Sequence, residues 1–176
     1  MPAPHRKTNF LLLLIALTLC VIWGNSLLPA SVSAAMSGGI KDFLNSLIGI
    51  TGGEGLSGDG WLRKAAHVTE FAVLGIELTV LFATYQKNHE DQDAEGLPVV
   101  RKNPGTREIV LRAALLLSCG FAVAVVDETI QLFSAGRAGM VQDVWIDFGG
   151  FLIGSLVTRI ISGIASRSRG RNPRRL

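Results

Sequence analysis

The sequence has few cysteines, few charged residues and none of the usual zinc-binding motifs. Of its 176 residues 18% are charged, against about 25% in soluble globular domains. The only cysteines, Cys20 and Cys119, lie within apolar stretches, so no disulfide framework is expected and each is interpreted as a small apolar residue. HExxH and CxxC spacings are absent, and the glycine-rich stretch 49–60 lacks the lysine of a phosphate-binding loop.

Apolar blocks take the place of these features. The mean hydropathy is +0.38, and a bilayer is crossed by about 20 consecutive apolar residues. Four blocks are this long, and the chain length fits one domain. We therefore predict an all-α membrane protein, a bundle of four transmembrane helices. The predicted spans are about 10–28, 61–85, 109–133 and 141–164, within a membrane domain of residues 10–164 that lies between an N-terminal segment 1–9 and a basic tail 165–176.

The first block also resembles a secretory signal peptide, because Arg6 and Lys7 precede it and Val32-Ser33-Ala34 follows it. Its apolar run is long for that role, and cleavage would leave three spans. We expect the block to be retained.

Basic residues are concentrated in the two termini and in the loop between the second and third spans. The positive-inside rule therefore predicts that both termini are cytoplasmic. This clustering indicates membrane topology, and no nucleic-acid partner is expected. Within the extracytoplasmic segment 29–60, apolar residues at helical spacing predict a short amphipathic helix on the outer leaflet or against the bundle: Ile40, Phe43, Leu44, Leu47 and Ile48.

Spans two to four contain charged and polar residues, which are costly at mid-bilayer, at about 2.5–3.5 kcal/mol each, and usually mark a functional interior. At about 100° per residue each span carries its polar residues in one stripe, and His67, Asp127 and Asp147 all lie about 9 Å below the outer surface. We predict a pocket of acids and histidine under a basic rim, whereas Glu77 is too deep to belong to it. The candidate ligand-binding residues are Lys64, His67, Glu70, Asp127, Glu128, Gln131, Arg137, Asp143 and Asp147, and Arg63 shares the rim.

Two interpretations of this cluster remain open. The polar groups could neutralise one another to hold helices together, with Asp127 on Lys64 and Glu128 on Arg137. They could instead form a site for a ligand, an ion or a proton, because the acids outnumber the nearby bases. Histidine with carboxylates can bind a divalent metal, but without a supporting motif no metal or cofactor is expected. The GxxxG pair Gly150 and Gly154 predicts close helix packing inside the bundle.

At these residues the sequence resembles the VanZ-like family of bacterial membrane proteins. The resemblance rests on two stretches, residues 64–75 and 127–154, and on Asn25-Ser26 and Pro29 at the end of the first span. Asp147 stands where the family commonly has asparagine, which adds a charge. The resemblance implies a four-span protein of the cytoplasmic (inner) membrane of a bacterium, with retention of the first span. The family's namesake is associated with low-level resistance to the glycopeptide teicoplanin, but the resemblance implies no settled biochemical activity.

The leading hypothesis is a cell-envelope protein whose pocket binds or modifies an envelope lipid or a lipid-linked glycan headgroup, with an effect on glycopeptide susceptibility. The alternatives are a proton- or cation-coupled transporter, which with four spans would need to form a homo-oligomer, and a structural partner of an envelope assembly or export system. An enzyme would need a positioned acid-base pair, for which His67 with Glu70 is a candidate, and whether the protein is an enzyme stays open.

Overall fold

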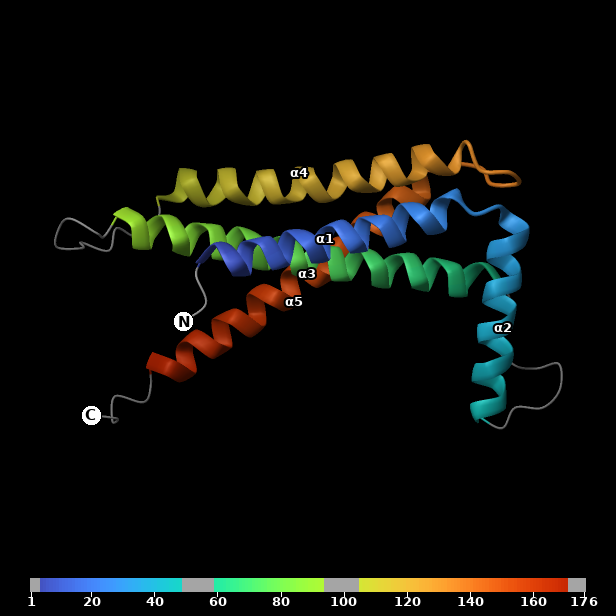
Figure 1. Ribbon diagram of the computed structural model, residues 1–176, viewed down its shortest axis with the longest axis horizontal. Helices are drawn as coiled ribbons and strands as arrows, with labels where there is room; N and C mark the ends of the chain where they lie inside the picture. The colour runs from blue at the N-terminus through green and yellow to red at the C-terminus, as the bar shows by residue number, and fades with distance from the viewer. Residues whose placement is uncertain (1–3, 49–58, 94–104, 171–176) are drawn as a thin grey trace.

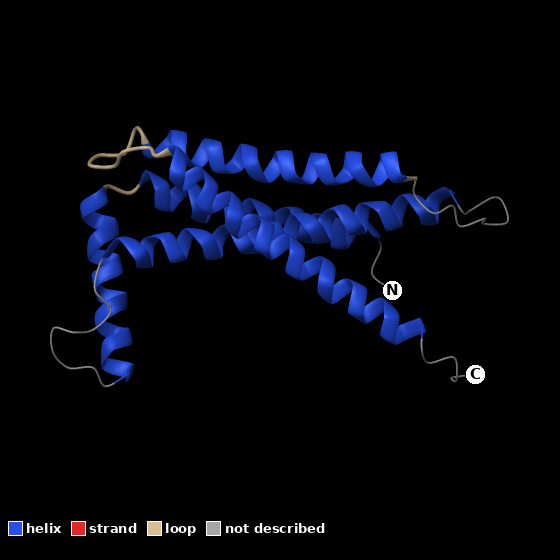
Figure 2. Cartoon of the chain, turned by 180° about the vertical axis from the view of Figure 1, so that it is seen from behind, coloured by secondary structure: helices blue, strands red, loops and turns tan. Residues whose placement is uncertain are grey.

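The computed structural model describes residues 4–48, 59–93 and 105–170. These residues form five helices and no strand: α1 (Pro4–Leu27), α2 (Ala30–Ile48), α3 (Asp59–Asp93), α4 (Thr106–Gln131) and α5 (Val141–Gly170) (Figures 1 and 2). Four of them are long and apolar enough to cross a membrane, over Arg6–Leu27, Leu62–Gln86, Thr106–Gln131 and Val141–Ser168. The predicted all-α fold with four membrane spans is confirmed.

The helices extend beyond the predicted spans at several ends. The helix α3 continues to Asp93 and α5 to Gly170, so part of the predicted loop and part of the basic tail are helical. By contrast α4 ends at Gln131, and Leu132 and Phe133 lie in the turn that follows. This turn contains Gly136 at φ 74°, a conformation that favours glycine.

The helix α2 lies crosswise at the end of the bundle where α1 ends and α3 begins (Figure 1). It is longer than predicted, because it starts at Ala30, directly after α1. The backbone N–H of Ala30 donates to the carbonyl of Ala135 in the α4–α5 turn, at 3.0 Å. Ile40 and Phe43 are exposed, so these two side chains do not pack against the bundle. The side chains of Leu44, Leu47 and Ile48 lie outside the described residues.

The first residues of α1 and the last of α5 lie at the opposite end of the bundle from α2, and α5 crosses α3 obliquely (Figure 1). Glycines permit this crossing. A Cβ on Gly150 would lie 2.5 Å from the carbonyl oxygen of Val68, and one on Gly154 would collide with that of Ala72. The prediction that the GxxxG pair packs inside the bundle is confirmed, whereas the neighbouring Gly149 has no atom within 4 Å of such a Cβ.

The apolar core is small, as expected for a bundle whose outer surface faces lipid. Phe71, Leu74 and Phe151 are fully buried where α3 and α5 cross. Large apolar side chains on the outside of the spans are mostly exposed, including Leu13, Leu115 and Ile160. In a bilayer these side chains contact acyl chains, so their exposure carries no penalty.

Candidate functional site

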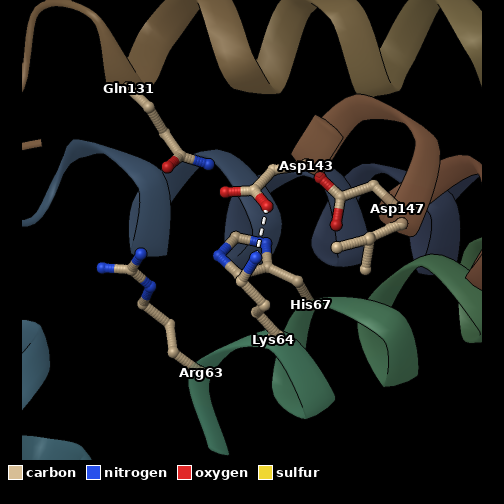
Figure 3. Close-up of a pocket in the computed structure, with 7 residues that line it drawn as sticks. Arg63, Lys64, His67, Gln131, Asp143 and Asp147 are labelled. Carbon is tan, nitrogen blue, oxygen red and sulfur yellow. Dashed lines mark hydrogen bonds and ion pairs between the residues drawn. The ribbon is translucent and has the colours of Figure 1, made fainter. Parts of the chain in front are cut away.

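Polar side chains gather inside the bundle at the end nearest α2. There the first turns of α3, the last turn of α4 and the first turns of α5 meet around a small cavity of about 10 Å³ (Figure 3), enough for about one water molecule. The cavity is lined by Arg63, Lys64, His67, Gln131, Asp143, Ile146 and Asp147.

Asp127 is the most buried acid of this cluster, with an exposed fraction of 0%. Its Oδ1 accepts a hydrogen bond of 2.7 Å from the hydroxyl of Ser26 on α1, and its Oδ2 accepts one of 3.0 Å from the amide of Gln131. The same Oδ2 lies 3.8 Å from Nδ1 of His67, too far for a hydrogen bond. The hydrogen bonds of Asp127 therefore join α4 to α1, and its Oδ2 also faces His67 on α3.

Lys64 and Asp143 form the ion pair at the cavity mouth, with Nζ 2.7 Å from Oδ1 (Figure 3). The suggested pairing of Lys64 with Asp127 is wrong. Lys64 is one turn nearer the mouth than His67, and its side chain is 41% exposed, so it meets the first acid of α5. Asp127 lies deeper and takes neutral hydrogen-bond donors.

Glu128 and Arg137 also differ from the suggested pair. The carboxylate of Glu128 accepts the backbone N–H of Met140 at 2.5 Å, just before α5 begins. The guanidinium of Arg137 donates to the carbonyl of Asn25 at 2.9 Å, and burial lowers the pKa of Arg137. The two residues fasten the α4–α5 turn, one to the start of α5 and the other to the end of α1.

Glu70 lies one turn deeper on α3 than His67, and its Oε1 accepts a hydrogen bond of 2.5 Å from the side-chain amide of Asn25. Deeper still, Glu77 accepts one of 3.0 Å from Thr18. Both bonds join α3 to α1. Glu77 does not line the cavity, as its predicted depth indicated.

The structure therefore divides the nine candidate residues into two groups. Lys64, His67, Gln131, Asp143 and Asp147 line the cavity, whereas Glu70, Asp127, Glu128 and Arg137 surround it and join helices. The surrounding layer also contains residues that sequence reasoning did not select for the site. These are Asn25, Ser26 and Ser134. The hydroxyl of Ser134 donates to the backbone carbonyl of Ser26 at 2.6 Å. The family resemblance could have indicated two of these residues, because Asn25-Ser26 belongs to the stretches that resemble the VanZ-like family.

Comparison with known proteins identifies the family of the chain. The VanZ/LLP1 family matches residues 10–162, from the first apolar block to the end of the last. The chain belongs to the VanZ/LLP1 family. No curated protein and no solved structure matches the chain. The matched residues include most of each of the four candidate spans and the whole polar cluster, and membership supports a multi-pass membrane protein.

Proposed function

We propose that this VanZ/LLP1 protein binds the anionic headgroup of an envelope lipid or lipid-linked glycan at the mouth of the cavity. The proposal rests on the absence of a partner for Arg63. It lines the cavity and is only partly buried, yet it makes no hydrogen bond or ion pair with any residue that the structure describes. A guanidinium is suited to two-point contact with a phosphate.

The surrounding charges favour a headgroup that carries both a phosphate and hydroxyl or amine groups. Lys64 adds a second, half-exposed cation beside Arg63, and Asp143 and Asp147 supply acceptors below. The cavity itself holds about one water molecule, so the headgroup lies over the mouth and only a small group enters. The lipid tails would extend along the apolar outer surface of the bundle.

The proposal also requires that the cavity mouth open to the side of the membrane where the headgroup lies. We infer from the distribution of basic residues that both termini are cytoplasmic in a bacterial inner membrane, so the cavity mouth faces the extracytoplasmic side, where envelope glycans are assembled.

The test is native mass spectrometry of the full chain, extracted in neutral detergent and titrated with phosphatidic acid, a polyprenyl phosphate or phosphatidylcholine. The wild-type chain is expected to retain the two phosphate-terminated lipids and to release phosphatidylcholine. Arg63→Gln should reduce that retention at least tenfold. Arg112→Gln is the matched control, because Arg112 pairs with Glu108 at the other end of the bundle. Equal retention by wild type, Arg63→Gln and Arg112→Gln would exclude this binding site.

Coupled transport is the second candidate. It is favoured by two half-buried acids along α3, Glu70 and Glu77. The Oε2 atom of each is buried without a hydrogen-bond partner in the described structure. Carboxylates in such a row are typical of proton relays. Proteoliposomes with a trapped pH indicator separate the two candidates, because a headgroup-binding protein gives no proton flux and a relay is silenced by Glu77→Gln.

A further inference from the structure

Three buried side chains from three different spans converge beside the cavity. A nitrogen of His67 on α3 and one carboxylate oxygen each from Asp127 on α4 and Asp147 on α5 all lie within 4.8 Å of one another. Their exposed fractions are 8%, 0% and 2%. Donor atoms about 2.1 Å from one ion are about 3.4 Å apart at the tetrahedral angle, so small side-chain rotations would bring all three to a common ion.

Two of the three side chains lack the partners that burial normally requires. Nδ1 of His67 has no hydrogen-bond partner, although it is buried. Asp147 makes no hydrogen bond and no ion pair with any described residue, and in Figure 3 it extends from α5 toward the same space as His67. An unpaired buried carboxylate is costly. A cation bound between Asp147 and Nδ1 of His67 would remove this cost.

Asp127, in contrast, is already held in one orientation. Ser26 fixes its Oδ1 and Gln131 its Oδ2, which is how the outer layer of a metal site positions a carboxylate ligand. A carboxylate oxygen that accepts one hydrogen bond still has a lone pair. Oδ2 is also the oxygen that lies 3.8 Å from Nδ1 of His67, a separation suited to two ligands of one ion.

The cavity supplies the remaining element, which is space for an exchangeable ligand. His67 and Asp147 line it, and its volume of about 10 Å³ suits a single water molecule. A divalent cation would also balance the two carboxylate charges, so the cluster would be neutral within the membrane.

We propose that His67, Asp127 and Asp147 bind one divalent first-row transition-metal ion, with Zn²⁺ and Mn²⁺ the best matches, and leave a coordination position open to the cavity. One imidazole and two carboxylates form a mixed nitrogen and oxygen donor set, which suits these ions better than the all-oxygen sites of Ca²⁺ or the thiolate sites of Cu⁺. Asp147 is shared with the proposed headgroup site, but Arg63 and Lys64 are not metal ligands, so metal binding can be tested without a lipid.

The experiment uses the full chain in neutral detergent, stripped with a chelator and then equilibrated with Zn²⁺ or Mn²⁺ alone. Metal analysis after gel filtration should find about one equivalent of at least one of the two ions. His67→Ala and Asp147→Asn should each weaken binding at least tenfold, as measured by calorimetric titration. Glu77→Gln, which removes a half-buried acid away from the cavity, should bind metal as wild type does.

Two further measurements keep the test independent of whether a variant folds. Co²⁺ added to the wild-type chain should give visible absorption bands of a low-symmetry site, and Zn²⁺ should abolish them. The wild-type melting temperature should rise with added Zn²⁺ or Mn²⁺. Less than a tenth of an equivalent of both ions in the wild-type chain would overturn the proposal, as would equal binding by wild type, Asp147→Asn and Glu77→Gln. Failure of lipid retention with intact metal binding would overturn only the headgroup proposal.

Discussion

The hydroxyl of Ser26, in the last turn of α1, donates a hydrogen bond of 2.7 Å to Oδ1 of Asp127 in α4, and both residues have an exposed fraction of 0%. Ser26→Ala would leave this buried carboxylate oxygen without its donor. We expect the loss to lower the free energy of unfolding by about 1–3 kcal/mol. Reversible unfolding of the purified chain in mixed micelles measures it. Ser166→Ala is the control, because the Ser166 hydroxyl is exposed and bonds only to the carbonyl of Gly163, so its removal should change little.

The same contact predicts that the first helix stays attached. Cleavage after Ala34 would remove Asn25 and Ser26, and with them the hydrogen bonds to Glu70 and Asp127. The fully buried Asp127 and the half-buried Glu70 would then remain within the membrane without these donors, at a cost of several kcal/mol. N-terminal sequencing and intact mass of the mature protein are expected to find the α1 sequence. A chain that begins at Ala35 would contradict both the prediction and the four-span bundle.

The crossing of α3 and α5 predicts unequal effects of substitutions at two glycines of one helix. A side chain at Gly154 would collide with the carbonyl of Ala72, whereas a Cβ at Gly163 would have no atom within 4 Å. Gly154→Val should lower the free energy of unfolding by about 1–3 kcal/mol or more. Gly163→Ala should be neutral or stabilise by up to about 1 kcal/mol, because alanine is the better helix former. Equal melting temperatures for the two variants would show that the helices do not cross so closely.

The spans and the helix crossing were predictable from the sequence, whereas the pairing of the buried charges was not. The four spans, the GxxxG crossing and the convergence of His67 and Asp147 were predictable, because long apolar runs, small residues at helical spacing and charges inside them are visible in the sequence. The pairing of charges was not. Whether Lys64 meets Asp127 or Asp143 depends on how far each helix is rotated and shifted along its neighbour. Ser26 gave no signal from burial cost, since a serine in an apolar helix is inexpensive and only the folded bundle places it on Asp127.

The inferred orientation predicts the accessibility of single cysteines in a background where Cys20 and Cys119 are replaced by serine. Ala138, in the α4–α5 turn, and Ser168, near the end of α5, are both exposed and lie at opposite ends of the bundle. An impermeant thiol reagent should label Ala138→Cys in intact cells, and it should label Ser168→Cys only after the membrane is permeabilised. The reverse pattern would invert the protein in the membrane and place the cavity mouth in the cytoplasm.

The polar cluster predicts that its acids differ in what they support. Each oxygen of Asp127 accepts a hydrogen bond, one from Ser26 and one from Gln131. In Asp127→Asn the new NH2 group would face one of these two donors, so the free energy of unfolding should fall by about 1–3 kcal/mol. Asp147 has no such partner among the described residues. Asp147→Asn removes an unpaired buried charge, so it should leave the melting temperature unchanged or raise it while function is lost. Function is measured by complementation of a deletion strain for envelope integrity and glycopeptide susceptibility, with Arg112→Gln as the variant expected to complement fully. If Asp147→Asn is folded and complements as well as the native gene, the cluster only holds helices together and the functional site lies elsewhere.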